Sequence, residues 1–112
     1  MAKKRPAQYN IYILDGKHPV PCDDILVWGR WLADLNNRKV ARTITDNGEV
    51  STVFLGLDHG FAGPTELPIL FETLVFGGTL DGETKRCCTW PQAEKQHAEM
   101  VRRVKRARKK GV

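Results

Sequence analysis

The clearest pairing signal in the chain lies in residues 40–57, which read VARTITDNGEVSTVFLGL. Asn47-Gly48 interrupts this stretch, and that dipeptide suits the positive φ angles of a two-residue hairpin turn. β-branched residues on both sides of the turn favour strands, so the sequence predicts strands over residues 40–46 and 49–57. We therefore expect an antiparallel hairpin at the centre of the fold.

Further strands are predicted on both sides of this hairpin. Residues 69–76, ILFETLVF, and the shorter polar segment 83–88 follow it, and residues 9–14, YNIYIL, precede it. Pro19 and Pro21 favour an extended connection after the first strand, because proline fixes its own φ and restricts the residue before it. The expected sheet is an antiparallel meander of about five strands.

A first helix is expected after Asp23 and Asp24, since acidic residues favour a helix N-terminus. Apolar residues then recur at spacings of three and four, and Asn36-Asn37 is expected to end the helix. The residues of this stripe are Ile25, Trp28, Leu32 and Leu35, with Trp31 at its edge.

A second helix is predicted over residues 90–108. Thr89 and Gln92 match a capping box, and Pro91 in the first turn removes no intrahelical hydrogen bond. The expected element order is βαββββα, which defines an α+β protein whose antiparallel sheet packs with two helices.

The two middle strands have apolar residues on both faces. Val50 and Phe54 point to one side of the sheet, while Val53, Leu55 and Leu57 point to the other. A sheet with two apolar faces needs cover on both. Either each predicted helix covers one face, which leaves a monomer, or the second face packs against another copy. We expect a homo-oligomer, a dimer or larger.

Charge is divided unevenly along the chain, whose formal net charge is +5. The two ends hold ten of the 18 Lys and Arg residues, so the other eight share the middle with all 13 acids and leave it net negative. We expect a basic arm over residues 1–8, one domain over 9–104 and a basic tail over 105–112. Any polyanionic partner should bind at the ends.

No run of 18 apolar residues and no apolar leader segment occurs, so a cytoplasmic protein without a membrane segment is expected. Three cysteines, Cys22, Cys87 and Cys88, form an odd set without CxxC spacing. Free thiols are therefore expected, and neither a disulfide framework nor a paired-cysteine metal site is predicted.

Several residues of types used in catalysis occur without catalytic spacing. No HxH, HExxH or glycine-rich phosphate loop is present, so we expect no metal, no cofactor and no enzymatic activity. Asp58 and His59 are expected as turn residues that bond local backbone. His97 is expected as a core or interface histidine with one satisfied nitrogen. Glu72 either faces Arg42 or Arg86, or lines a ligand pocket.

The arginines near the end of the second helix are the main candidate site. Arg102, Arg103 and Arg106 lie within little more than one helical turn, and guanidinium groups hold phosphates bidentately. Trp90 offers a ring on which a base could stack. If the helix pairs with a symmetry mate, the arginines of two chains would share a cleft that suits a small nucleotide. The alternative is a solvated basic tail or non-specific contact with nucleic acid.

Three segments resemble a family of small proteins encoded by tailed phages and prophages. They are 50–59, VSTVFLGLDH, 68–77, PILFETLVFG, and 89–97, TWPQAEKQH. The resemblance covers about residues 9–104 and does not reach the basic tail. Cys87-Cys88 departs from the more usual aromatic-plus-polar pair of that family. The resemblance implies a phage accessory protein acting in the host cytoplasm.

By element order, a small sheet before a long C-terminal helix, the chain is also similar to phage anti-defence sponges. These proteins sequester the cyclic ADP-ribose signals of the Thoeris immune system. This similarity implies phosphate binding by Arg102, Arg103 and Arg106, with Trp90 stacking on the base. We therefore expect non-enzymatic binding of an anionic nucleotide. The alternatives are an RNA- or DNA-binding protein that uses the basic ends, or a minor virion or assembly component.

Overall fold

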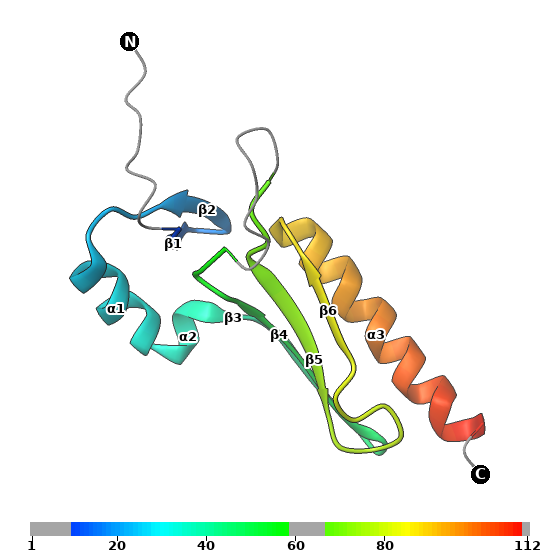
Figure 1. Ribbon diagram of the computed structural model, residues 1–112. Coiled ribbons are helices and arrows are strands. Elements are labelled where there is room, and N and C mark those ends of the chain that lie inside the picture. Colours follow the sequence, from blue (N-terminus) through cyan, green and yellow to red (C-terminus); the bar gives the residue numbers. More distant parts are fainter. Residues whose placement is uncertain (1–9, 59–66, 111–112) are drawn as a thin grey trace.

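The computed structural model describes residues 10–58 and 67–110, the last three of them by their backbone only. Nine elements follow one another in the order ββααββββα (Figure 1). They are β1 (Tyr12–Asp15), β2 (His18–Pro21), α1 (Ile25–Ala33), α2 (Leu35–Arg38), β3 (Lys39–Thr45), β4 (Gly48–Phe54), β5 (Phe71–Phe76), β6 (Thr84–Cys87) and α3 (Trp90–Lys110).

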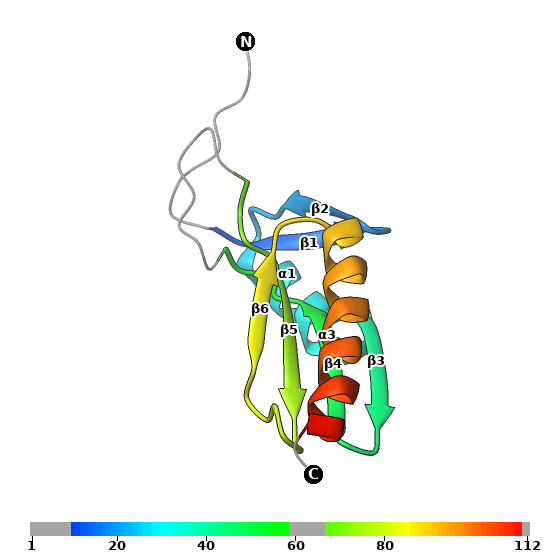
Figure 2. The same ribbon diagram turned by 90° about the vertical axis from the view of Figure 1, so that its right-hand side faces the viewer.

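The main sheet is an antiparallel meander in the order β3-β4-β5-β6. The central hairpin forms at the predicted position, with Thr45 opposite Gly48, and Val50 pairs with Val75 in the next strand. Gly48 has a φ of 122°, a conformation that L side chains rarely adopt. Helix α3 runs along one face of this sheet (Figure 2). The expected α+β class is confirmed.

The expectation of a single five-strand sheet is wrong. The first strand, β1, pairs with β2 in a separate two-stranded sheet, so Pro19 and Pro21 belong to a strand and not to a connection. Proline is tolerated there because both strands of such a ribbon are edge strands. The ribbon is tied to the end of the main sheet by Tyr12 N, which donates to Gly56 O at 2.8 Å.

The first helix ends earlier than expected, at Ala33. Asp34 is extended, with φ −84° and ψ 107°, and its side chain accepts a hydrogen bond from Asn36 N. The same residue therefore ends α1 and caps the short helix α2, because an aspartate side chain competes with the backbone for amide donors. Asn36-Asn37 consequently lies inside α2.

Helix α3 begins where the capping box predicts. Thr89 N donates to Gln92 Oε1 and Gln92 N donates to Thr89 Oγ1, both at 3.2 Å. The helix continues to Lys110, two residues beyond the predicted end at Arg108, and so includes most of the basic segment 105–112. Its apolar stripe packs on the sheet in two clusters. One joins Val50, Val75, Met100 and Val104, and the other joins Phe54, Leu70, Phe71 and Ala93.

The other face of the main sheet is left uncovered by the described residues. We call it the open face; it carries the side chains that alternate away from α3, which are Lys39, Arg42, Ile44, Glu49, Ser51, Val53, Glu72, Leu74, Phe76, Thr84 and Arg86. Helix α1 is held at the end of the sheet, where Trp31 packs edge-on against Phe54 at 5.7 Å between ring centroids. The arrangement in which the first helix covers the second face is therefore not adopted (Figure 1).

Candidate functional site

Four basic residues lie in the last turns of α3 whose side chains the structure describes. We call them the basic end of α3; they are Arg102, Arg103, Lys105 and Arg106. All four side chains are exposed. Arg103 Nη2 donates to Glu83 Oε1 at 3.0 Å, and Nη1 lies 3.5 Å from Met100 Sδ. The other three form no hydrogen bond or ion pair within the described part of the chain. Their charge is available to a partner.

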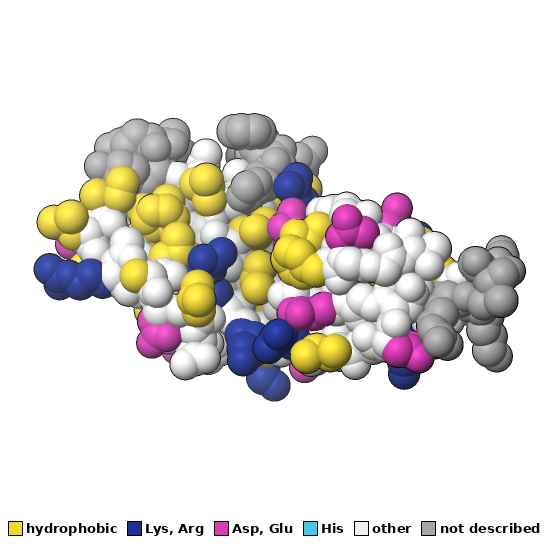
Figure 3. All heavy atoms as spheres, turned by 90° about the horizontal axis from the view of Figure 1, so that it is seen from below, with side chains coloured by type: hydrophobic (Ala, Val, Ile, Leu, Met, Phe, Trp, Pro, Cys, Tyr) yellow, Lys and Arg dark blue, Asp and Glu magenta, His cyan; other side chains and the backbone are white. Residues whose placement is uncertain are grey.

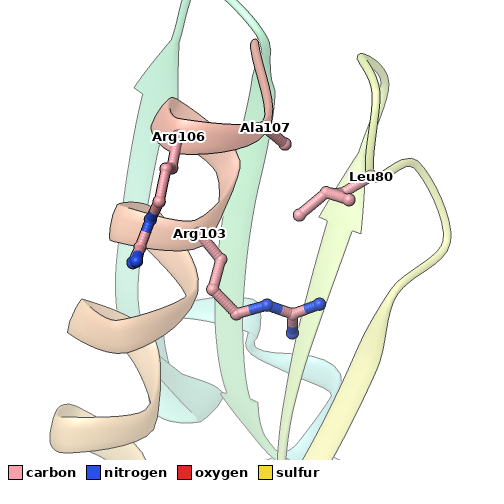
Figure 4. A pocket seen from close by; sticks show the side chains of 4 residues that line it. All are labelled: Leu80, Arg103, Arg106 and Ala107. Carbon is pink, nitrogen blue, oxygen red and sulfur yellow. The ribbon is translucent and has the colours of Figure 1, made fainter. Parts of the chain in front are cut away.

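Two of these arginines border a shallow depression of about 300 Å³, together with Leu80 and Ala107 (Figure 4). Arg103 extends toward the strands, whereas Arg106 runs along the helix, away from the strands. The two guanidinium groups therefore do not converge on one point. Arg102 is not among the residues that line the depression.

Trp90 is distant from the basic end of α3. It stands 13 residues before Arg103 on the same helix, which at 1.5 Å per residue places the two about 20 Å apart. The Trp90 ring packs against Phe71, with centroids 6.2 Å apart, and the Lys17 ammonium lies 5.6 Å from its centroid. One small ligand cannot contact both Trp90 and these arginines within one chain.

Trp90 instead borders a second, more enclosed pocket of about 280 Å³. This pocket lies between the β1–β2 hairpin, the residues before β5 and the start of α3, and its lining includes Tyr12, Lys17, Pro19 and Pro68. Trp90 Nε1 is buried there without a hydrogen-bond partner among the described residues. Sequence reasoning missed this pocket because its walls come from three distant segments, and only Trp90 gave a signal.

Glu72 faces an arginine, which was one of its two expected arrangements. Arg86 Nε donates to Glu72 Oε2 at 3.0 Å, across β5 and β6. Arg42 pairs with Glu49 instead, at 2.6 Å between Nε and Oε2. The hydrogen bond from Arg42 lowers the pKa of the Glu49 carboxyl, and the same bond raises the pKa of Arg42. Both pairs lie on the open face and stabilise it locally.

His97 lies on the side of α3 that faces the sheet, where it is buried and both of its ring nitrogens form hydrogen bonds. The expectation of one satisfied nitrogen is therefore wrong. Nδ1 lies 2.7 Å from Thr52 Oγ1, and Nε2 lies 2.9 Å from Thr43 Oγ1. Thr52 in turn bonds Thr73, which accepts from Gln96 Nε2 at 3.0 Å.

Every member of this chain of hydrogen bonds has a partner. Gln96 donates to Thr73 through its nitrogen, and each threonine hydroxyl can both donate and accept, so either neutral tautomer of His97 satisfies the chain. Burial lowers the pKa of His97 because it penalises the charged ring. His97 is a core histidine in a satisfied polar chain, and its nitrogens are already occupied.

The cysteine thiols are free and poorly suited to nucleophilic chemistry. Burial raises the pKa of Cys87 to about 11, with a further contribution from Cys88, and burial also raises the pKa of Cys88. A thiol with a raised pKa holds little of the reactive thiolate at neutral pH. Cys22 is buried.

Asp58 is buried, and its Oδ1 accepts from Ile69 N at 2.9 Å, a residue eleven positions later in the chain and not a local turn partner. This bond ties the segment after β4 to the segment before β5. His59 lies outside the described residues. Within residues 10–58 and 67–110, no three His, Cys, Asp or Glu side chains form a group that could hold a metal ion.

No protein-family model, curated protein or solved structure matches this chain. None of the helices, over the residues that the structure describes, has both the length and the apolar character that crossing a membrane requires. The functional assignment therefore rests on the geometry of the sites themselves.

Proposed function

We propose that the protein is a non-enzymatic binder of nucleic acid whose phosphates contact the basic end of α3. The observation that carries this proposal is the set of three exposed cations, Arg102, Lys105 and Arg106, that lack a partner in the described chain. Such charges attract a polyanion by releasing its condensed counterions. Arg103 can also contact a phosphate, because this requires breaking only its exposed ion pair with Glu83, which contributes about 1 kcal/mol or less.

The shape of the site favours a long polyanion over a single enclosed ligand. The depression beside Arg103 and Arg106 is shallow, and the two guanidinium groups extend in different directions from it. Successive phosphates of a nucleic-acid backbone can each contact a different one of these cations. None of the described residues that line the depression is aromatic, which favours contact with the backbone over reading of bases.

Salt-dependent binding tests this proposal. Fluorescence anisotropy with a labelled DNA duplex gives the affinity at several salt concentrations between about 50 and 200 mM. Each phosphate contact contributes about 0.9 to the slope of log K against log salt. The triple variant Arg102→Ala, Lys105→Ala, Arg106→Ala should therefore lower the magnitude of that slope by roughly 2 to 3.

A matched control removes the same charge elsewhere. Lys39, Lys85 and Lys95 are exposed and form no ion pair with the described residues, and their combined replacement by alanine should leave most of the slope in place. Equal loss in both triple variants would mean that only net charge matters. That result, or binding that does not respond to salt, would refute a site at the end of α3.

A small anionic nucleotide, as in sequestration of a host immune signal, is the second candidate. The observation in its favour is the depression of about 300 Å³ that brings Leu80 beside Arg103 and Arg106, at the lower end of typical ligand pockets. Calorimetry with cyclic ADP-ribose isomers tests it. A nucleotide held by one or two phosphates should lose far less affinity with salt than a duplex does. No binding at low micromolar concentration would remove this candidate.

A further inference from the structure

The pocket beside Trp90 has enclosed apolar walls. It holds about 280 Å³ where the β1–β2 hairpin passes beside the first turn of α3 (Figure 2), and Leu70 in its wall is only 1% exposed. Figure 3 shows other apolar side chains toward the α1 end of the molecule, spread over an open surface. Leu26 and Leu35, on α1 and α2, are 71% and 73% exposed. An enclosed apolar pocket with a few polar groups is the usual form of a small-ligand site.

We propose that this pocket binds a small organic anion, with a flat apolar body of about two fused rings and one carboxylate. The volume sets the size of the body. A cavity of about 150 Å³ holds one benzene ring, so a pocket of about 280 Å³ has room for two rings. The body packs on Trp90, Pro19 and Pro68, which line the pocket, and the carboxylate pairs with Lys17 at its edge.

The β1–β2 hairpin holds Lys17 at the pocket. Asp15 pairs with His18, which leaves a turn of two residues between them. Gly16, the first of the two, has the positive φ of 64° that such turns favour. From this turn the Lys17 ammonium lies 5.6 Å from the centroid of the Trp90 ring, and it forms no ion pair within the described part of the chain. Its charge is available to a ligand carboxylate.

Charge selects an anion as the ligand of this pocket. Its lining includes Lys17 and His18, and no Asp or Glu is among the described residues that line it. Burial raises the pKa of Cys88, a lining residue, and the nearby charge of Asp58 adds to this rise. Asp58 itself accepts a hydrogen bond from Ile69 N and is not part of the lining. An acidic ligand group therefore meets an ammonium without an acidic partner and no carboxylate in the wall.

Trp90 adds an unsatisfied donor to the site. Its Nε1 is buried, and no described residue accepts a hydrogen bond from it. Buried polar groups without partners are uncommon in native proteins. A ligand oxygen beside this nitrogen supplies the missing acceptor.

The pocket and the basic end of α3 are separate sites. They lie about 20 Å apart along the same helix, and no residue of the basic end lines the pocket. The ligand of the pocket is therefore independent of what the basic end of α3 binds.

Titration with indole-5-carboxylate, followed by ¹H–¹⁵N NMR of the labelled protein, tests the site. The indole N–H peak of Trp90, assigned by triple-resonance experiments, should shift and saturate. At the efficiency of drug-sized ligands the dissociation constant should be about 2 mM or lower. The peak of Trp28, whose Nε1 donates to Gly56 O at 3.0 Å, should move less. A Trp90 peak that does not saturate by about 20 mM ligand would overturn the proposal.

The role of Lys17 is tested with indole, which has the same two rings and no carboxylate. Wild type should bind indole about two- to fivefold more weakly than indole-5-carboxylate, the range expected for one exposed ion pair. Lys17→Met should remove this difference. Lys39→Met, at an exposed lysine outside the pocket, loses the same charge and should keep it. Equal affinities of wild type for the two ligands would contradict an anion site.

A second pair of variants tests the location of the site. Leu67 lines the pocket and is 63% exposed, so Leu67→Asp should keep the wild-type circular dichroism spectrum. It should weaken binding of indole-5-carboxylate by about fivefold or more, because it removes apolar wall and adds a like charge. Leu35→Asp, at a residue that is 73% exposed and outside the pocket, should bind like wild type. Wild-type affinity in Leu67→Asp, or the same loss in both variants, would place the ligand elsewhere and overturn the proposal.

Discussion

The two faces of the main sheet are built from the same strands and have different physical roles. Strand β5 places Phe71, Thr73 and Val75 under α3, where they are at most 1% exposed. In alternation with them, Glu72 and Phe76 reach the open face, one in an ion pair and the other half exposed. Residue type therefore does not decide which side is the core. The position of α3 does, since it removes one face from water and leaves the other available for contacts.

The largest expected effect separates two phenylalanines of one strand. Phe71→Ala should lower the free energy of unfolding by about 3 to 5 kcal/mol, because a fully buried ring leaves a cavity. Phe76→Ala, at a half-exposed position, should cost about 1 kcal/mol or less in dilute protein. Urea denaturation followed by circular dichroism measures both. Equal losses of unfolding free energy in the two variants would mean that the two faces of the sheet are equally buried, which would contradict the difference described above.

A smaller effect is expected where the hairpin turn meets α3. The side chain of Asn47 donates to Val104 O at 3.0 Å and accepts from Thr79 N at 3.1 Å, and the residue is buried. Asn47→Ala should cost about 1 to 3 kcal/mol, because it leaves buried backbone groups without partners. Asn36→Ala, at an exposed residue of α2, is the control in the same urea measurement and should cost less.

His97 should make the covered face sensitive to acid. Its folded pKa lies below the ordinary value of 6.5, so the unfolded chain binds more protons as the pH falls through that value. Stability from the neutral ring is thus complete above about pH 6.5 and is lost progressively below it. His97→Gln should cost about 1 to 2 kcal/mol at about pH 8 through its hydrogen bonds, and it should flatten the fall below about pH 6.5.

The control for this prediction is His18→Gln, at an exposed histidine of β2. At about pH 8 that variant should keep the wild-type melting temperature within a few degrees, because substitutions of exposed side chains change stability little. If His97→Gln and wild type lose the same stability on acidification, the neutral state of His97 does not contribute to the packing of α3.

The smallest effect is expected on the open face. Arg86→Ala removes the partner of Glu72, and an ion pair in which Arg86 is 45% exposed should contribute about 1 kcal/mol or less. Its effect should shrink further in about 0.5 M salt, where exposed charges are screened. A loss above about 2 kcal/mol by urea denaturation would show that this face is desolvated even in the single chain.

Local signals in the sequence predicted the elements better than their assembly. The turn at Asn47-Gly48 and the capping box of Thr89 and Gln92 depend on residues close in sequence, and both form as expected. The separate β1–β2 sheet was missed because two prolines argued against a strand. Whether they are tolerated depends on an edge position that sequence does not specify.

The sequence predicted which residues belong to the candidate site, but it did not predict how their side chains are arranged in space. The basic residues of α3 follow from the helix period, but the ion pair of Arg103 with Glu83 depends on tertiary structure, and so does the position of Trp90 at the wall of a separate pocket. The same is true of His97. Its second partner, Thr43, comes from a strand 54 residues earlier in the chain. Apolar patterning also predicted cover on both faces of the sheet, without indicating where α1 would lie.

The order of elements along the chain also sets the order of folding. Strands β3 to β6 each pair with their sequence neighbour, so the sheet can form progressively during synthesis. Helix α3 comes after all of them and completes the cover over Phe54 and Phe71, of which Phe54 also packs on Trp31. Until Trp90 and the residues beyond it have been translated, both faces of the nascent sheet expose apolar side chains to water. A chain that ends before that point should therefore aggregate or be degraded.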